Sequence, residues 1–499
     1  MTNPPALTIR VFLEQFRGMI LLNIVLWALI PGILFGNLHV DTLEALYWAR
    51  VPAFGYWKHP PITTWLLGIA AQPGDYSILL ALLLSQALTV VTAYLTGRAA
   101  TTLAGLRAGQ LAVALFFVSS LASFYSLQIN HNSVLAPFMA ATLAFGIDYL
   151  EKRKLISIIG LGLAVGLGAL TKYEIIFAVL PLFIIALAIS RYRSVFGEAR
   201  SYISLAIAAL VIAPHLLWLH DHDWISIKRA ADSAPLTDAQ SVFEGFWGVL
   251  WGSVAIVLTP LLMLRFYKIS LPNLGFFNLK RHDERFRIGW IILILSPLGL
   301  IFTGLITGQF VKALWLLPLA PAISIGAGIV LAHKISKRFD ERHISLTLKG
   351  MVTLFALFWA YLFAGELVGH PHEAYFSQTK PLARQVEALW KRHQSKPLAC
   401  VIINEVKIGG SPVLWLTDKP LFIEIPFRPW GTTDKQTLCN DEGAIVIDLD
   451  EGVPAKEYFP RLCDKSFEPI DVRSLMGRAP SIWPGHISYL PPRSETCAP

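Results

Sequence analysis

Charged side chains are scarce in this sequence of 499 residues. Asp, Glu, Lys and Arg make up 15% of it, whereas a soluble chain has about 25%. Hydrophobic residues make up 54%, and we find no internal repeat and no low-complexity run. The shortage of charge excludes an ordinary soluble domain and indicates a protein that lies in a membrane.

Long apolar runs recur along the chain. A run of about 18 or more residues is long enough to cross a hydrocarbon core roughly 30 Å thick. We therefore predict an α-helical polytopic membrane protein with about eleven spans, although the run from Ala108 to Leu150 can be divided in more than one way. The predicted centres lie near Leu26, Leu84, Phe116, Ala140, Val165, Val179, Leu210, Ile256, Leu295, Leu319 and Phe358.

Every second loop is rich in Lys and Arg, whereas the loops between them are poor in these residues. Because cytoplasmic loops carry the excess of these residues, we expect a cytoplasmic N-terminus and a periplasmic tail after about residue 368, in a bacterial inner membrane. The net charge of +8 is then mostly a topology signal. The cations are spread over many short loops, which argues against a nucleic-acid partner. The cation-rich segments are 10–17, 98–107, 152–154, 191–200, 268–287 and 334–349.

Cysteine is rare and confined to one part of the chain. The four cysteines, Cys400, Cys439, Cys463 and Cys497, all lie in the tail. In an oxidising compartment they can pair. A zinc site is the alternative, but no C-x2-C spacing is present. We expect at least one disulfide, with Cys439–Cys463 favoured because both residues flank one compact stretch.

The tail also differs in pattern. The segments "ACVIIN", "PLFIEI" and "GAIVIDL" are typical of short buried strands, and helix-like or loop stretches separate them. This pattern predicts a small α/β domain. We place a transmembrane domain at residues 1–368 and a periplasmic α/β domain at residues 369–499.

The first loop expected outside reads "DTLEALYWARVPAFGYWKHPP". Asp41 and Glu44 are three residues apart, so on a helical turn both carboxylates share one face. Asp41 could instead be a helix N-cap with Glu44 at the third position, which needs no chemistry. Lys58 and His59 follow within the same short loop. Paired carboxylates beside a Lys-His pair at the membrane surface favour an active site that reads a lipid headgroup.

Further polar residues fall at the expected outer ends of spans. Alternating His and Asp residues, such as His220 and His222, can bind a divalent metal ion, but a solvated loop start is the favoured reading. Lys172 and Lys312 could be simple interfacial anchors. The other candidates are Tyr173, Asn130 and Asn132.

The first loop resembles the signature of the GT-C superfamily of integral-membrane glycosyltransferases. Their relatives include protein mannosyltransferases and the bacterial transferases that attach aminoarabinose to lipid A. The resemblance continues in "GLGALTKYEIIFAVLPL", "PHLLWLHDHDW" and "KALWLLPL". It implies a GT-C fold, a sugar donor linked to polyprenyl phosphate, and transfer on the outer face. The common adjacent acids are spaced here, as Asp41 and Glu44, and the second outer loop has no carboxylate, which weakens the case for a family-type metal site.

Transfer from a lipid-phosphate sugar needs a base and cations for the leaving phosphate. Asp41 or Glu44 is the predicted base. The predicted donor-binding residues are Tyr56, Lys58, His59, Lys172, Tyr173 and Lys312, and the accessory or acceptor-binding residues are Asn130, Asn132, His220 and His222. The expected acceptor is an envelope molecule such as lipid A, a glycolipid or a protein. The rival reading is a transporter or flippase of lipid-linked sugars, but no repeat supports it.

Overall fold

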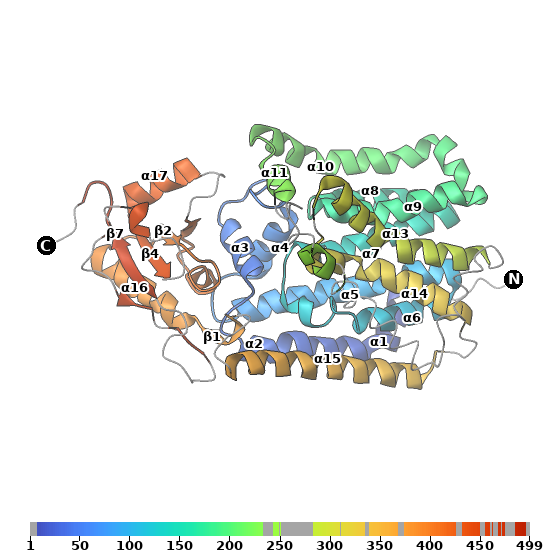
Figure 1. Ribbon diagram of the computed structural model, residues 1–499, viewed down its shortest axis with the longest axis horizontal. Coiled ribbons are helices and arrows are strands. Elements are labelled where there is room, and N and C mark those ends of the chain that lie inside the picture. The colour runs from blue at the N-terminus through green and yellow to red at the C-terminus, as the bar shows by residue number, and fades with distance from the viewer. Residues whose placement is uncertain are drawn as a thin grey trace.

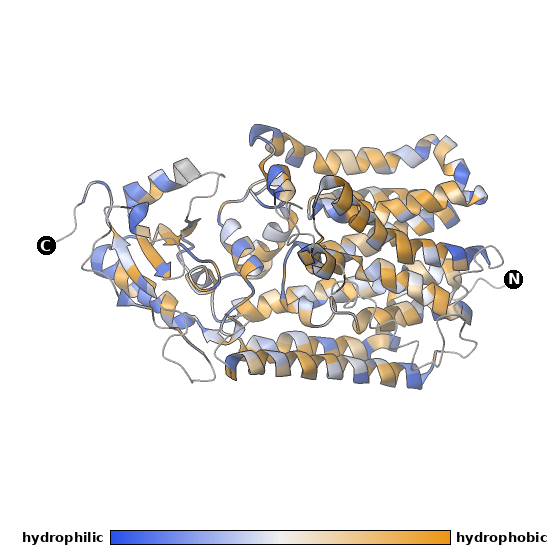
Figure 2. Cartoon of the chain, in the orientation of Figure 1, coloured by the Kyte–Doolittle hydropathy of each residue, from blue (hydrophilic) through white to orange (hydrophobic). Residues whose placement is uncertain are grey.

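The computed structural model has a long helical body and a smaller domain at the end away from the N-terminus (Figure 1). We call the smaller part, from Ala374 onward, the tail domain. Hydrophobic residues dominate the helices of the body, whereas hydrophilic residues are frequent in the tail domain (Figure 2). The structure describes residues 7–232, 243–248, 250, 283–309, 311–334, 339–367, 374–425, 432–449, 455–459, 462, 468–470, 472–474 and 485–495.

The body is built from apolar helices because a chain in lipid must satisfy its own backbone hydrogen bonds. Seven helices of the described residues can each cross a membrane, or eight if the bent pair Tyr173–Ala188 and Ser190–Gly197 forms one span. The main helices are α1 (Ile9–Ile24), which continues through a π-helical stretch into α2 (Ile30–Leu34), α5 (Ser77–Ala104), α6 (Leu106–Phe117), α7 (His131–Lys152), α8 (Leu155–Ala169), α9 (Ile176–Ala188), α10 (Ile203–Asp221), α13 (Glu284–Thr307), α14 (Ala320–Lys334) and α15 (Glu341–Leu367).

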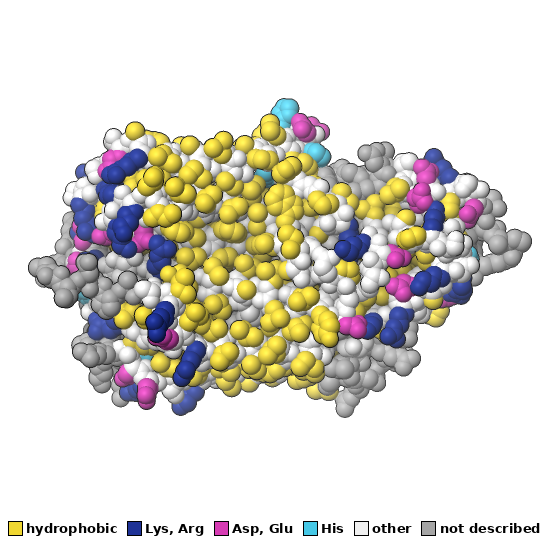
Figure 3. Space-filling model, turned by 180° about the vertical axis from the view of Figure 1, so that it is seen from behind, with side chains coloured by type: hydrophobic (Ala, Val, Ile, Leu, Met, Phe, Trp, Pro, Cys, Tyr) yellow, Lys and Arg dark blue, Asp and Glu magenta, His cyan; other side chains and the backbone are white. Residues whose placement is uncertain are grey.

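Every predicted span centre except one falls in an apolar helix. Leu319 lies in the helical stretch Ala313–His333, and α6 and α8 are shorter than a full span. Ile256 lies outside the described residues. The polytopic helical fold is therefore confirmed, and exposed apolar side chains cover the face of the body seen in Figure 3, between its charged ends.

Small residues let neighbouring helices approach closely. A Cβ atom on Gly326 of α14 would lie 2.6 Å from the carbonyl oxygen of Gly289 on α13. On α8, a Cβ atom on Gly162 would lie 2.6 Å from the carbonyl oxygen of Ser204 on α10. Close backbone approach is the usual basis of helix packing in lipid, where apolar burial supplies little driving force.

The tail domain contains a five-stranded sheet in the order β3-β2-β4-β7-β5. Strands β2 (Cys400–Ile403), β3 (Leu421–Glu424) and β4 (Ala444–Leu449) are parallel, and β7 (Gly485–Leu490) pairs antiparallel with β4 and with β5 (Glu468–Pro469). The three parallel strands are the three predicted ones. Helices α16 (Lys380–His393) and α17 (Thr432–Glu442) accompany the sheet, and β1 (Ser377–Gln378) pairs with β6 (Arg473–Ser474). The α/β class is confirmed, whereas the boundary at residue 368 lies outside the described residues.

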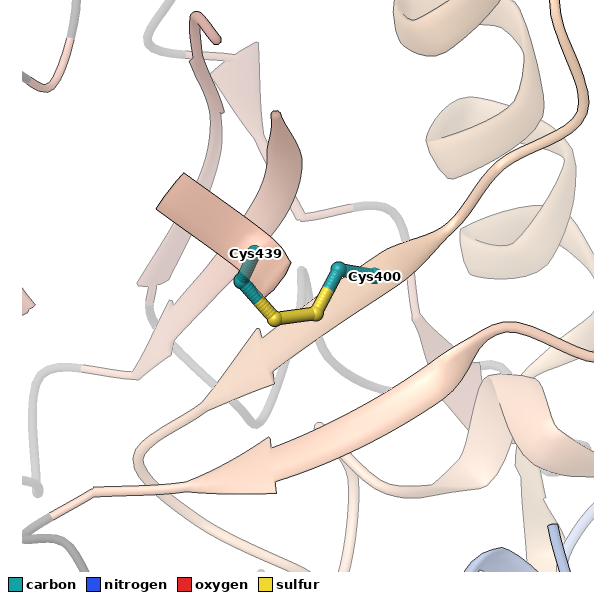
Figure 4. Close-up of a disulfide and its surroundings, with 2 residues drawn as sticks. All are labelled: Cys400 and Cys439. Carbon is teal, nitrogen blue, oxygen red and sulfur yellow. A yellow bond between two sulfur atoms is a disulfide. The ribbon is translucent and has the colours of Figure 1, made fainter. Parts of the chain in front are cut away.

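The tail domain has a disulfide, but not the predicted one. Cys439 of α17 is bonded to Cys400 of β2, with a Cα–Cα distance of 5.5 Å (Figure 4). The predicted pairing of Cys439 with Cys463 is therefore wrong. The physical reason is that α17 packs against β2 and β3, which brings two residues 39 positions apart into contact. Cys463 and Cys497 lie outside the described residues.

The tail domain is attached to the body through the end of α2 and the following loop. The Gly36 amide donates to the Tyr375 carbonyl oxygen at 2.8 Å, and the Thr379 hydroxyl donates to the Gly36 carbonyl oxygen at 2.8 Å. Tyr47 stacks on Phe422 of β3 at 5.8 Å between ring centroids. The first loop of the chain is thus held between the body and the tail domain.

Candidate functional site

A cavity of about 510 Å³ is lined by the first loop and by the starts of α7 and α9. These segments lie at the tail-domain end of the body (Figure 1). This volume is in the range typical of ligand sites, roughly 300–1,000 Å³. Part of its wall is polar and cationic, and part is apolar where α9 and α13 line it. The polar lining residues are Asp41, Lys58, His59, Asn130, His131, Asn132, Lys172, Tyr173, Glu174, Ser226, Arg229, Thr303, Thr307, Gln309 and Lys312.

The two predicted acids lie on the short helix α3 (Val40–Trp48). The N-cap of this helix is His39, whose Nδ1 accepts from the Asp41 amide at 3.3 Å. The alternative in which Asp41 caps the helix is therefore wrong. The Asp41 side chain is 36% exposed and lines the cavity, whereas the Glu44 side chain is only 5% exposed. The two carboxylates thus have different surroundings.

Glu44 is fixed by a lysine from the following loop. The Lys58 ammonium lies 2.8 Å from both carboxylate oxygens of Glu44. Burial raises the pKa of Glu44 to about 7, although the Lys58 charge acts in the opposite direction. Lys58 itself lines the cavity. Glu44 therefore positions the Lys58 ammonium at the cavity wall, although Glu44 itself does not line the cavity.

Two asparagines at the start of α7 connect the acid to a second lysine. Asn130 is the N-cap of α7, and its Nδ2 donates to Asp41 Oδ2 at 3.1 Å. The Oδ1 of Asn132 accepts from the Lys172 ammonium at 2.8 Å. The capping box between Asn130 and Ser133 fixes the backbone here. One helix start thus orients both Asp41 and Lys172.

All four cations of the described cavity lining lie near tryptophan rings. Lys58 and Arg229 lie 5.5 and 5.4 Å from the Trp57 ring centroid. Lys172 and Lys312 lie 5.6 and 5.9 Å from that of Trp315. Such cation–π contacts hold cationic groups without neutralising them.

Two histidines of the cavity lining stack on each other. The rings of His59 and His131 are 3.6 Å apart between centroids. Burial lowers the pKa of His59 well below its usual range, and the nearby His131, Lys172 and Lys58 act in the same direction. His59 is therefore uncharged at neutral pH, and its ring is available as a hydrogen-bonding or stacking surface.

Tyr173 is held by a histidine from α10. The Tyr173 hydroxyl lies 2.8 Å from His215 Nε2, and His215 Nδ1 lies 2.7 Å from the Phe54 carbonyl oxygen. A carbonyl oxygen only accepts, so Nδ1 donates and Nε2 accepts from the tyrosine. The Ser226 hydroxyl of α11 (Ile225–Ala231) lies 3.3 Å from the same phenol. The tyrosine is thus fixed at the edge of the cavity.

Besides Glu44, three predicted residues do not line the cavity. Tyr56 is buried beneath the loop, where it stacks on Trp48 at 5.6 Å between ring centroids. His220 is 77% exposed, and His222 stacks on Trp218. No group of three or more His, Cys, Asp or Glu side chains in the described part of the chain could hold a metal ion. The described residues do not fit a metal centre, so we derive no step through one.

The cavity also contains residues that sequence reasoning did not select. Glu174 lies 2.7 Å from the Lys172 ammonium, and Trp315 supports two of the lysines. The adjacency of Lys172, Tyr173 and Glu174 was visible in the sequence. Nothing in the sequence indicated Ser226, because only the tertiary fold brings α11 to the cavity.

The sequence is similar to those of known glycosyltransferases. A family model described as dolichyl-phosphate-mannose-protein mannosyltransferase matches residues 58–218. Lipopolysaccharide core galacturonosyltransferase RgtB from Rhizobium johnstonii is 26% identical over 390 residues, which are 75% of this chain and 76% of that protein. Lipid A galacturonosyltransferase RgtD from the same organism is 23% identical over 319 residues, 63% of this chain and 64% of that protein.

The fold is also found among solved structures. The crystal structure of ArnT from Cupriavidus metallidurans bound to undecaprenyl phosphate superposes with a TM-score of 0.64 and 12% identity, over 96% of this chain and 98% of that one. The apo structure of the same protein gives a TM-score of 0.62. The shared fold covers both the helical body and the tail domain. With the family model and the curated relatives, it confirms the resemblance seen in the sequence to the GT-C superfamily of integral-membrane glycosyltransferases.

Proposed function

We propose that this glycosyltransferase takes a sugar from a polyprenyl-phosphate donor, of the undecaprenyl-phosphate type, and transfers it to lipid A or the lipopolysaccharide core. The acceptor is supported by the names of the curated relatives, which act on these two molecules. The donor is supported by the solved relative bound to undecaprenyl phosphate. Both substrates are amphipathic lipids of the cell envelope.

The observation that carries the proposal is the two-sided wall of the cavity. Lys58 and Lys172 line its polar part beside Asp41. Ile176 and Phe177 of α9 and Leu300 of α13 line its apolar part. A lipid phosphate needs cations at its headgroup and an apolar surface along its first isoprene units. One cavity supplies both.

Asp41 is our proposed general base. Its carboxylate reaches the cavity, and Asn130 holds one oxygen. The acceptor hydroxyl loses its proton to Asp41 as its oxygen attacks the anomeric carbon of the donor sugar. The bond between that carbon and the phosphate oxygen breaks, and polyprenyl phosphate leaves with the bonding electrons. Its second negative charge develops beside Lys58 and Lys172, which stabilise it.

Glu44 has a positioning role in this proposal. It contacts Lys58 through both carboxylate oxygens and does not line the cavity. A lysine with three rotatable donors is otherwise flexible, so the bidentate contact fixes the ammonium before the donor arrives. The proposal thereby separates the roles of two acids that the sequence leaves equivalent.

We further propose that the cavity and the tail domain face the periplasm. The cation-rich ends of α5 and α7 meet at the opposite end of the body, where the Lys152 ammonium lies 2.8 Å from Asp148 Oδ1. Because cytoplasmic segments carry the excess of Lys and Arg, that end faces the cytoplasm in this proposal. Reporter fusions after Lys349 and after Lys396 should report opposite sides of the membrane. The same side for both would contradict this orientation.

The activity can be tested with purified protein in lipid nanodiscs. We expect a polyprenyl-phosphate sugar and rough lipopolysaccharide to give a glycosylated acceptor and free polyprenyl phosphate, both measured by mass spectrometry. A transporter or flippase of lipid-linked sugars would instead move the donor intact between leaflets. Donor movement without a glycosylated product would overturn the proposal.

A further inference from the structure

Arg229 differs from the other cations of the cavity in its surroundings. It projects from α11 into the cavity, with its guanidinium 5.4 Å from the Trp57 ring centroid. No carboxylate among the described residues lies within ion-pair distance of it. Lys58 and Lys172, by contrast, have Glu44 and Glu174 as partners. The guanidinium of Arg229 is therefore available to pair with an anionic group of a ligand in the cavity.

Positive charge is in excess around this point. Four cationic side chains line the cavity, whereas Asp41 and Glu174 are the carboxylates of its described lining. The pKa of Lys312 is lowered by partial burial and by the nearby Arg229, Lys58 and Lys172. Glu44 lies behind Lys58, and with a pKa of about 7 its charge offsets the excess only in part.

The proposed donor does not account for this excess by itself. The phosphodiester that links a sugar to a polyprenol carries one negative charge. A neutral hexose would leave Arg229 beside uncharged hydroxyl groups, and an amino sugar would place a like charge next to it. A carboxylate on the sugar would match the fork of the guanidinium through two parallel hydrogen bonds.

We propose that the transferred sugar is a uronic acid and that Arg229, assisted by Lys312, reads its carboxylate. This inference rests on the proposed function and adds the class of sugar to it. The two named relatives are galacturonosyltransferases, which is independent support from outside the charge argument. Arg229 is thus a specificity-determining residue, separate from Asp41 and Lys58.

The test compares two donors that differ only at C6 of the sugar: polyprenyl-phosphate galacturonate and polyprenyl-phosphate galactose of the same lipid length. The full-length protein in nanodiscs should use the uronosyl donor with the higher kcat/KM. Arg229→Gln should lower kcat/KM for that donor about 10- to 100-fold, the value of a hydrogen-bonded charge, and lower kcat/KM for the galactosyl donor by a much smaller factor. The preference for the acid should therefore collapse in this variant.

Lys228→Gln is the matched control, because Lys228 is an exposed cation of the same helix that does not line the cavity. It should leave both donors unaffected. An equal loss for both donors in Arg229→Gln would assign Arg229 to the phosphate or the acceptor and overturn the inference. Wild-type protein that prefers galactose, or accepts only an amino sugar, would overturn it while the proposed function stands. No turnover with any polyprenyl-phosphate sugar would overturn both.

Discussion

The two ends of the helical body both gather charged residues, but they arrange them differently. At the end away from the tail domain, the buried carboxylate of Asp148 is surrounded by Arg98, Lys152 and Thr102. At the tail-domain end, Asp41 contacts Asn130 and lies open to a cavity lined by four cations. Charges that neutralise one another stabilise a structure, whereas charges left open to a cavity are available to a ligand. This difference, and not the number of charges, marks the functional end.

The sharpest way to break this comparison is to remove one acid from each end. Asp41→Asn keeps nearly the same volume and removes the proposed base, so we expect kcat to fall about 10³-fold with little change in stability. Purified variants of equal monodispersity should be assayed with a polyprenyl-phosphate sugar. Unchanged turnover in Asp41→Asn would exclude this residue as the base.

Asp148→Asn is the counterpart at the opposite end. It leaves Arg98 and Lys152 without their carboxylate, so we expect a stability loss of about 1–3 kcal/mol. Activity per folded molecule should be preserved, because Asp148 does not line the cavity. Thermal unfolding in detergent, measured beside the activity, separates the two effects. A large loss of kcat at unchanged stability would contradict the assignment of this end.

The pH dependence should reflect the pairing of Glu44 and Lys58. As the pH falls through about 7, Glu44 takes up a proton and loses its hold on Lys58, so kcat/KM should fall. The raised pKa of Glu44 has the opposite effect on the stability of the fold. The contribution of Glu44 to the free energy of unfolding is fully present below pH 4.5 and is lost as the pH rises to about 7. Protonation of Glu44 therefore lowers the rate without unfolding the protein.

Glu44→Gln tests this interpretation. We expect kcat/KM to decrease about 10-fold, the value of a charge-assisted hydrogen bond. The fall of kcat/KM as the pH drops through about 7 should disappear in this variant. The profile should be recorded with wild type and variant under saturating acceptor. If kcat/KM of the variant still falls as the pH drops through about 7, another group is responsible for the pH dependence.

The pattern of the sequence predicted the parts of this fold that depend on local properties. Apolar runs located the helices, and the segments around Cys400, Leu421 and Ala444 located the parallel strands. Contacts between distant residues were not predictable in this way. The approach of Lys312 to Lys172 and the pairing of Cys400 with Cys439 depend on tertiary packing, which composition and periodicity do not encode. His39 as the N-cap of α3 was missed because histidine is a rare cap.

The disulfide should have the smallest effect on catalysis. It closes a separation of 39 residues, which corresponds to about 4 kcal/mol in the chain-entropy model. The double variant Cys400→Ala/Cys439→Ala should therefore lower the stability of the tail domain. Turnover at low temperature should change by no more than about twofold, since neither cysteine lines the cavity. Loss of turnover in a variant that remains folded would show that the tail domain takes part in the reaction more directly.

The central claim is that the cavity holds a lipid phosphate, and a structure of the protein with undecaprenyl phosphate tests it most directly. The account predicts the phosphate within hydrogen-bond distance of Lys58 and Lys172, and the first isoprene units against Phe177 and Leu300. A phosphate bound at the opposite end of the body, near Arg98 and Lys152, or a lipid that leaves the cavity unfilled, would contradict it.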